Sequence, residues 1–322
     1  MAQFDILVAD VIALDALTPL SADPRFNLTV KTGLKGDELR DAIAGADAVL
    51  VRSATKITRD SLSRADRLKV IGRAGVGVDT IDVDAATERR IPVLTAPAGN
   101  TVSAAELTMA LLLALARRVP AADRSMRAGE WDRKSFNGVE LYGKTLGLVG
   151  AGRIGGEVAI RARAFGMRVM VFDPFLKPDR ATALGVETAE LDEILTRADV
   201  LSVHVPLTDE THGLIGEAQL AKLKPSAFVL NVARGGVVDE DALLKALQSK
   251  RLAGAALDVY SSEPLPADHP FRTLPNVVLT PHLGASTAEA QQNVAIEIAE
   301  AVRAALLDND VSRAVNARWM VG

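Results

Sequence analysis

The stretch that most constrains the fold is GAGRIG at residues 150–155, together with what flanks it. A short apolar run, TLGLV, enters the glycines at 145–149, and a helical pattern follows from 153 to 165. A second apolar run, 168–172, is followed by Asp173, which lies 18 residues beyond the last glycine. Strand, glycine turn, helix, strand and terminal acid, in this order, predict a βαβ unit that binds a dinucleotide. The acid at the end of the second strand disfavours the alternative of a purely structural glycine turn.

Each glycine has a physical reason to be there. Gly150 would allow the tight turn, and Gly152 would let the backbone approach a pyrophosphate. Gly155 would let the helix pack closely on the strand. The N-terminus of the helix would attract the phosphate charge.

Composition excludes several classes of protein. The chain has 322 residues, of which 48% are hydrophobic and 24% are charged, as in an ordinary globular protein with room for two domains. A net charge of −4 gives no reason to expect nucleic acid or an anionic membrane as a partner. The longest apolar run, 109–116, is too short to span a bilayer. The absence of cysteine excludes disulfides and thiolate metal sites and fits a reducing cytoplasm, and no metal is expected.

Strand-like apolar runs alternate with helical patterns along the chain, which predicts parallel sheets covered on both faces. The runs form two series: 6–9, 28–30, 48–51, 70–71 and 93–94, then 146–149, 169–172, 200–203, 228–232, 255–259 and 277–280. Helical patterns include 36–44, 79–89, 188–197 and 239–248. The prediction is an α/β protein with two doubly wound domains, one of the Rossmann type and a smaller, flavodoxin-like one.

Two further helices suggest how the domains connect. A long apolar helix is expected at 102–117, followed by a less regular stretch at 118–142, and a last helix at 287–307. We expect a discontinuous substrate-binding domain, residues 1–99 and 286–322, and a dinucleotide-binding domain, residues 100–285.

Polar groups follow the strands of the second series. In an open α/β sheet, ligands bind outside the carboxyl ends of the strands. Five ionisable residues are expected at that edge: Asp173, His204, Arg234, Asp258 and His282. One such residue is readily explained as a structural strand end, but five together point to a site.

His282 is the best candidate for a general base among the four histidines. Glu263 lies in a loop, SSEPLP, after the preceding strand, and a carboxylate on the second ring nitrogen would orient the imidazole. His204 is interpreted as lining a cofactor or completing a strand end, and His212 and His269 as loop or helix-boundary residues. Arg234 precedes two glycines that could aim its guanidinium inward at a planar carboxylate.

The motifs GAGRIG, NVARGGVVDE, AALDVYSSEP and TPHLGAST, with Asp173, resemble the D-isomer-specific 2-hydroxyacid dehydrogenases. Four other segments are similar to the members that oxidise D-3-phosphoglycerate, the first step of phosphorylated serine biosynthesis: VRSATKIT, GRAGVGVD, TAPAGNTVSAAE and GEWDRKSF. The resemblance covers nearly the whole chain.

The resemblance implies NAD as cofactor. Asp173 would bind the adenosine ribose and disfavour a 2′-phosphate, although Lys177 and Arg180 leave NADP open. Asp258 would bind the nicotinamide carboxamide. The family often has a polar residue where this chain has Val76 and Val205. The implied cofactor-binding residues are Gly150, Gly152, Arg153, Ile154, Gly155, Asp173, His204, Val205, Pro206, Val232, Ala233, Arg234, Asp258, His282, Gly284 and Ala285.

The resemblance also implies the catalytic group and the substrate contacts. Arg234 would hold the substrate, and His282, supported by Glu263, would take the C2 hydroxyl proton as hydride leaves for the nicotinamide. Phosphate would be bound by cations near the first-domain strand ends, with Arg133 reaching in from a neighbouring subunit; solvated surface arginines are the alternative. The implied substrate-binding residues are Arg52, Ser53, Arg73, Gly75, Val76, Gly77, Arg133, Arg234 and His282.

Two other functions stay open at this point. One is a glyoxylate or hydroxypyruvate reductase, which would not need Arg52, Arg73 and Arg133. The other is a non-enzymatic, NAD-sensing protein of the corepressor kind, which would not need His282 and Glu263. A homodimer or homotetramer is expected through the helix at 102–117 and the segment after it. The resemblance suggests a short form that ends soon after SRAVNA, without C-terminal regulatory domains.

Overall fold

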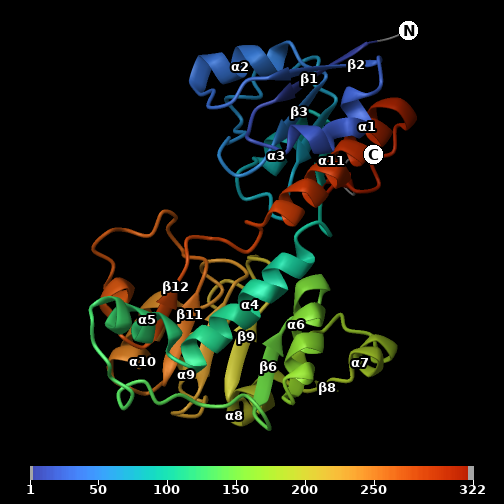
Figure 1. Ribbon diagram of the computed structural model, residues 1–322. Helices are drawn as coiled ribbons and strands as arrows, with labels where there is room; N and C mark the ends of the chain where they lie inside the picture. The colour runs from blue at the N-terminus through green and yellow to red at the C-terminus, as the bar shows by residue number, and fades with distance from the viewer. Residues whose placement is uncertain (1–2, 318–322) are drawn as a thin grey trace. The chain divides into compact units, whose positions relative to one another are not determined.

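In the computed structural model, which describes residues 3–317, the chain forms two compact units (Figure 1). One unit comprises Met1–Asn100 together with Ala285–Gly322, and the other comprises Thr101–Gly284. The outermost residues of the predicted substrate-binding domain, 1–2 and 318–322, lie outside the described residues.

The first unit contains a five-stranded parallel sheet in the order β2-β1-β3-β4-β5. This is the flavodoxin-like order that the sequence predicted. The register pairs Val8 with Leu50, so the loops that follow β1 and β3 leave the sheet side by side. The strands are β1 (Phe4–Val8), β2 (Phe26–Val30), β3 (Ala48–Val51), β4 (Val70–Arg73) and β5 (Val93–Thr95).

Helices cover both faces of this sheet because successive strand residues alternate between two apolar cores. Ile6 and Leu50 pack with Ile298 of the long C-terminal helix, whereas Leu7 and Val49 pack on the opposite side. The helices of this unit are η1 (Leu14–Leu17), α1 (Thr18–Ser21), α2 (Gly36–Ala44), α3 (Val83–Glu88) and α11 (Ala288–Asp308).

The segment after α11 packs against the same unit through a β-bridge and side-chain hydrogen bonds. Ala314 forms an antiparallel bridge with Leu94. The side chain of Asn316 is fully buried, accepts a hydrogen bond from Val93 N at 2.9 Å and donates to Ile91 O at 3.0 Å. Because both ends of this buried amide are satisfied, the SRAVNA segment is an integral part of the first unit.

The second unit contains a seven-stranded parallel sheet in the order β12-β11-β10-β9-β6-β7-β8. The order reverses between β6 and β9, as in a Rossmann fold, so the predicted fold class is confirmed. The strands are β6 (Thr145–Val149), β7 (Arg168–Phe172), β8 (Glu187–Thr188), β9 (Val200–Val203), β10 (Phe228–Asn231), β11 (Gly254–Leu257) and β12 (Val277–Leu279).

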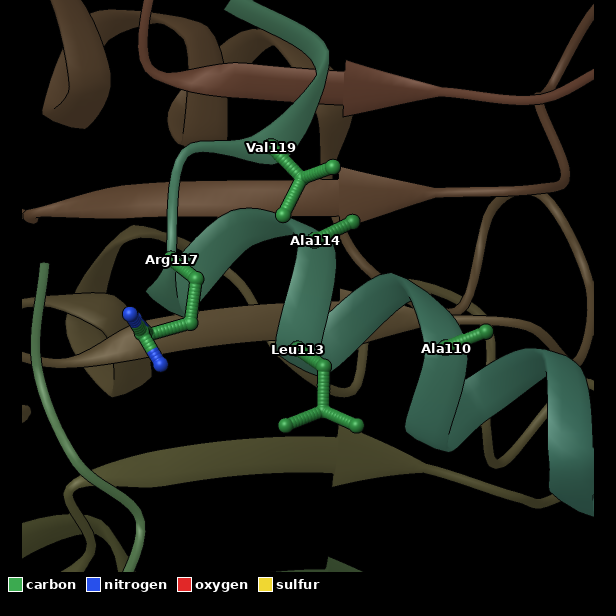
Figure 2. A pocket seen from close by; sticks show the side chains of 5 residues that line it. All are labelled: Ala110, Leu113, Ala114, Arg117 and Val119. Atoms are coloured by element: carbon green, nitrogen blue, oxygen red, sulfur yellow. The ribbon is translucent and has the colours of Figure 1, made fainter. Parts of the chain in front are cut away.

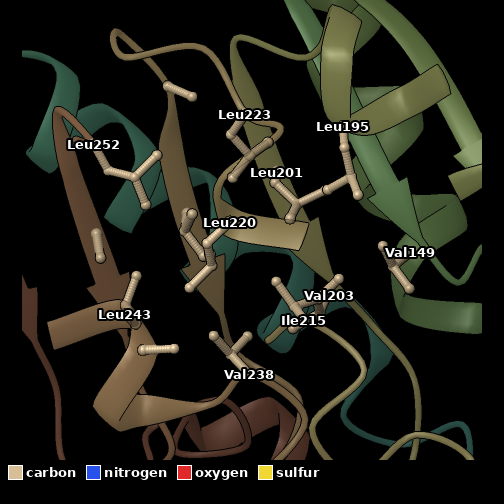
Figure 3. Packing of buried hydrophobic residues seen from close by; sticks show 14 of the residues in the cluster. Val149, Leu195, Leu201, Val203, Ile215, Leu220, Leu223, Val238, Leu243 and Leu252 are labelled. Atoms are coloured by element: carbon tan, nitrogen blue, oxygen red, sulfur yellow. The ribbon is translucent and has the colours of Figure 1, made fainter. Parts of the chain in front are cut away.

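Two apolar cores again enclose the sheet. On one face Leu148 and Val171 pack with Met109 of α4 and Ala159 of α6. On the other, Figure 3 shows Leu201 and the leucines and valines of the surrounding helices and loops interdigitating. The helical elements are α4 (Thr101–Ala116), α5 (Val119–Arg127), α6 (Arg153–Ala164), α7 (Pro178–Leu184), α8 (Leu191–Arg197), α9 (Glu217–Leu220), α10 (Glu240–Gln248) and η2 (Pro270–Thr273).

Three sequence expectations were wrong in detail. The helix expected at 188–197 begins only at Leu191, and Thr188 belongs to the strand β8. The stretch expected to be less regular after residue 117 contains α5, which begins after Arg118 in a left-handed conformation and has Pro120 in its first turn. The helix expected at 79–89 begins only at Val83, because Asp82 caps it by accepting a hydrogen bond from Ala85 N.

Within residues 3–317, each helix is too short or too polar to cross a membrane.

Candidate active site

The glycine turn after β6 has the shape that a dinucleotide requires. Gly150 has a φ of +92°, and a Cβ there would lie 2.8 Å from the carbonyl oxygen of His204. A Cβ on Gly155 would overlap the carbonyl oxygen of Gly150. A Cβ on Gly152 would meet no described atom within 4 Å, so the backbone there faces open space. The turn and the N-terminus of α6 therefore fit the pyrophosphate of NAD.

Asp173 lies beside this turn, at the end of the neighbouring strand β7. Its Oδ2 accepts a hydrogen bond from Ala151 N at 2.8 Å, and its Oδ1 accepts one from Phe175 N at 2.9 Å. Each carboxylate oxygen has a second acceptor site, so a ribose hydroxyl can still donate to it. The ribose contact stays a prediction.

The order of the sheet places the other predicted cofactor residues along one edge. The strands β6, β9, β10, β11 and β12 are parallel neighbours in that order, so their carboxyl ends follow one another. The loops at these ends carry His204, Val205 and Pro206 after β9, Val232, Ala233 and Arg234 after β10, Asp258 after β11, and His282 and Gly284 after β12. Ala285 is assigned to the other compact unit.

His204 is poorly suited to acid–base catalysis. Its Nε2 lies 2.9 Å from Ser202 Oγ, and burial lowers the pKa of the imidazole to about 4. The ring is therefore neutral near pH 7. This state fits a residue that lines the cofactor or packs against the glycine turn.

His282 and Glu263 are in direct contact. The Nδ1 atom of His282 lies 2.7 Å from Glu263 Oε2, and the other carboxylate oxygen accepts a hydrogen bond from Tyr260 N at 3.1 Å. With the carboxylate ionised, Nδ1 carries the proton and donates to it, which leaves Nε2 to accept or release a proton. The imidazole is about half exposed, with 48% of its side-chain surface accessible, so a substrate can reach it.

Asp258 holds the turn that carries His282. His282 has a φ of +54°, an unfavourable conformation for a residue with a side chain. The Asp258 carbonyl oxygen accepts from His282 N at 2.8 Å, and its carboxylate accepts from Leu283 N at 2.7 Å, Gly284 N at 2.9 Å and Thr280 Oγ1 at 2.6 Å. Asp258 is fully buried, so its carboxylate serves this turn; its predicted contact with the nicotinamide stays a prediction.

Arg234 is held by a buried amide at the end of β10. Asn231 accepts a hydrogen bond from Ala233 N at 3.1 Å and donates to Arg234 O at 2.8 Å. The Arg234 guanidinium donates to Ala233 O at 2.7 Å. Asn231 is 2% exposed, so it fixes the backbone from which Arg234 projects.

Gly235 packs directly on the loop that carries Glu263. A Cβ on Gly235 would overlap the backbone of Tyr260 and Ser261. Tyr260 N in turn donates to Glu263, which contacts His282. A chain of contacts thus connects the turn of Arg234 to the candidate base.

In the first unit, Arg52 and Arg73 lie at the carboxyl ends of adjacent strands, β3 and β4. The guanidinium of Arg73 donates to Ala74 O at 2.9 Å and occupies the place that a side chain at residue 75 would need. Gly75 has a φ of +155°, a backbone conformation that favours glycine, and a side chain there would also have to displace the Arg73 guanidinium. Ser53, Val76 and Gly77 belong to the same two loops.

Arg133 belongs to the other unit, in an exposed segment after α5. Its turn is held by Asp132 Oδ1, which accepts hydrogen bonds from Lys134 N at 3.0 Å and Ser135 N at 3.1 Å. A contact of Arg133 with a ligand of another subunit stays a prediction.

Sequence reasoning missed Asn231, the packing of Gly235 on the loop that carries Glu263, and the structural role of Asp258. Asn231 had one usable signal, because it is the single polar residue in the apolar run FVLNV. The backbone groups that these residues contact left no signal in the sequence.

Comparison with known proteins identifies relatives of the second unit and of the whole chain. The family profile described as D-isomer specific 2-hydroxyacid dehydrogenase, NAD binding domain, matches residues 109–284. The D-3-phosphoglycerate dehydrogenase of Methanocaldococcus jannaschii is 49% identical over 97% of this chain and 59% of its own length. The chain spans little more than half the length of curated relatives that it matches, from 54% for one of them to 59% for another.

Solved structures share the fold over their full length. The TT0316 protein from Thermus thermophilus is 40% identical with a TM-score of 0.87, covering 97% of this chain and 99% of that one. A glyoxylate reductase from Paecilomyes thermophila is 31% identical with a TM-score of 0.87, covering 98% of this chain and 99% of that one.

We predict that Gly235→Ala lowers kcat about tenfold or more. The added Cβ must displace the backbone at residues 260–261 and with it Glu263, and misplacement of a catalytic group by about 1 Å can cost up to about 100-fold. Steady-state kinetics and thermal unfolding would be measured together. Gly45→Ala is the control, because the nearest atom to a Cβ there is 3.8 Å away. A Gly235→Ala enzyme with the kcat of the control would contradict the prediction.

Proposed function

Since the chain belongs to the D-isomer-specific 2-hydroxyacid dehydrogenases, a family with an NAD-binding domain, we propose that it oxidises D-3-phosphoglycerate to 3-phosphohydroxypyruvate. This reaction begins the phosphorylated route to L-serine. The observation that carries the proposal is the contact between His282 and Glu263 at the carboxyl edge of the dinucleotide-binding sheet.

His282 is the general base in this proposal. Bound NAD supplies the acceptor for the hydride from C2. Nε2 of His282 takes the proton of the C2 hydroxyl group, while Nδ1 donates to Glu263. The carboxylate stabilises the imidazolium that forms, and the turn fixed by Asp258 keeps the ring in place.

Arg234 is the anchor for the carboxylate of the substrate. A guanidinium offers two parallel donors to a carboxylate, a geometry that lysine lacks. The buried Asn231 fixes the backbone at residues 233 and 234, and so fixes the position of the Arg234 Cα atom. Arg234 and His282 would thereby hold the carboxylate and the neighbouring C2 hydroxyl group of one small acid.

The phosphate would be bound in the first unit. Arg52 and Ser53 follow β3 and Arg73 ends β4, and these residues would bind the phosphate. The amides of residues 75–77 would form a nest for the carboxylate of the substrate. Arg133 of a second subunit is proposed to complete the set. An unphosphorylated acid, as in a glyoxylate or hydroxypyruvate reductase, would not need Arg52, Arg73 and Arg133, which favours the phosphorylated substrate.

A non-enzymatic NAD sensor is less well supported, because it would not need a histidine–glutamate pair. A cytoplasmic location suits an enzyme of amino-acid synthesis whose sequence contains no cysteine.

We also propose that the protein is a homodimer or homotetramer. The helix α4 is apolar around most of its circumference, yet Ala110 is exposed and Leu113 and Ala114 are only half-buried. Figure 2 shows these side chains beside Arg117 and Val119, where they border a hollow of about 390 Å³. A helix with apolar residues all round is normally covered, and a second copy of this chain would cover it.

We expect His282→Ala to lower kcat by about 10²- to 10⁴-fold, the usual contribution of a general base. NAD affinity, measured by titration of the cofactor, should change little. His269→Ala is the control, because the ring of His269 packs on Phe271 in a surface loop. Near-normal kcat in His282→Ala would exclude it as the base.

Arg52→Ala should raise the KM for D-3-phosphoglycerate about tenfold or more, since one charge-assisted hydrogen bond to phosphate is lost. The affinity for NAD and the KM for unphosphorylated D-glycerate should change far less. Arg59→Ala, which removes a surface arginine paired with Glu88, serves as the control. An equal loss with D-glycerate would argue against a phosphate site at Arg52.

Leu113→Glu should reduce the molar mass in solution, because a charge would be buried in the proposed interface. Light scattering after size-exclusion chromatography measures the mass. Val30→Glu, at an exposed position of the edge strand β2, is the control. An unchanged mass for Leu113→Glu would rule out an interface through α4.

A further inference from the structure

The loop that carries Arg52 and Ser53 is wrapped around a buried carboxylate. Asp10 follows β1 and is only 3% exposed. Its Oδ2 accepts hydrogen bonds from Arg52 N at 2.5 Å, Thr55 N at 3.2 Å and Ala54 N at 3.3 Å. Its Oδ1 accepts one from Thr55 Oγ1 at 2.6 Å. One side chain therefore organises the whole turn after β3.

Thr55 links this turn to the strand that carries Asp10. Its hydroxyl is buried and lies 3.1 Å from the carbonyl oxygen of Ala9 as well as 2.6 Å from the Asp10 carboxylate. A hydroxyl has one proton to donate, so the short contact with the charged oxygen is the stronger of the two. Both contacts draw residue 55 toward the end of β1.

A second buried aspartate in the same sheet, Asp47, differs from Asp10 in how its charge is compensated. Asp47 lies at the opposite end of β3 and is 5% exposed. It accepts a hydrogen bond from Asp5 N, but it also pairs with Arg67 at 2.8 Å and Lys69 at 3.3 Å. Asp10 makes no ion pair with any residue in the described part of the chain, so loop N–H groups and one hydroxyl compensate for its burial.

We propose that Asp10 is a positioning residue for the phosphate subsite of the substrate, an inference that rests on the proposed function. The carboxylate accepts hydrogen bonds from the amides of residues 52, 54 and 55 and so fixes the backbone that carries Arg52 and Ser53. No ion pair or side-chain hydrogen bond of the Arg52 guanidinium occurs within residues 3–317, so its charge remains for a ligand.

Removing the carboxylate would leave three amides without an acceptor, and the loop would populate several conformations. Binding weakens in proportion to the fraction of molecules that keep the competent one. The effect should appear in the KM for the substrate, since Asp10 belongs to the first unit, whereas the dinucleotide-binding sheet and His282 belong to the second.

The test compares Asp10→Ala and Thr55→Val with two matched controls, Asp47→Asn at the other end of β3 and Thr55→Ser, which keeps the hydroxyl. Asp10→Ala should raise the KM for D-3-phosphoglycerate about tenfold or more, the factor for one charge-assisted hydrogen bond, with kcat and NAD affinity within about threefold. Thr55→Val should give a smaller rise in KM. Hydrogen exchange should speed up at the amides of residues 52, 54 and 55 in Asp10→Ala but not in Asp47→Asn.

Failure of this inference is distinguishable from failure of the proposed function. If the unaltered protein prefers another 2-hydroxy acid, the proposed substrate is wrong, and the KM of the variants is measured with that acid. A KM within twofold of normal in a folded Asp10→Ala protein overturns the inference for either substrate. If Asp10→Ala does not fold, Thr55→Val decides: a KM equal to that of Thr55→Ser overturns it, and a rise reversed in Thr55→Ser supports it.

Discussion

Buried carboxylates that accept backbone N–H groups are the interaction on which the loops of both units depend. Asp10 follows β1 and holds the loop after its neighbour β3, and Asp258 follows β11 and holds the turn after its neighbour β12. The half-buried Asp173, after β7, likewise accepts a hydrogen bond from the glycine turn after β6. In each case the carboxylate follows one strand, and the backbone N–H groups that it binds follow the neighbouring strand. Parallel strands make this possible because their carboxyl ends emerge together.

The two edges of each sheet use carboxylates differently. At the amino edges, Asp47 pairs with Arg67, and Asp199 with Lys224 at 2.8 Å, while each also accepts a strand amide. At the carboxyl edges, Asp10 and Asp258 form no ion pair within the described residues and are compensated by amides and hydroxyls. The loops at the carboxyl edges can therefore be held in place without ion pairs to arginine. Arginines near these edges can then bind the carboxylate or phosphate of a ligand.

Patterns carried by side chains could be predicted from the sequence, whereas contacts with the backbone could not. Apolar runs located the strands of both sheets, although the two-residue strand β8 is exposed and left no apolar signal. The glycines and strand-end residues located the dinucleotide turn, His282 and Arg234. The structural roles of Asp10 and Gly235 depend on contacts with amides and carbonyls that nearly every residue possesses, so the sequence does not reveal them. Asn231 could be noticed only as a polar residue in an apolar run, and its two backbone partners could not be predicted. The helix α5 was missed because it has no buried residues to set an apolar period.

Ala314 and Asn316 bind to β5 of the first unit, and this contact affects the order in which the chain can fold during synthesis. The strands and helices of the unit Thr101–Gly284 form a continuous stretch that is complete before α11 has been made. The first unit can complete its core only after α11 has been made, because this helix covers one face of the sheet and contributes Ile298 and Val302 to the core. Domains usually fold in the order in which they leave the ribosome. Here the unit Thr101–Gly284 can reach its native state first, while the N-terminal strands keep an apolar face uncovered until α11 has been made.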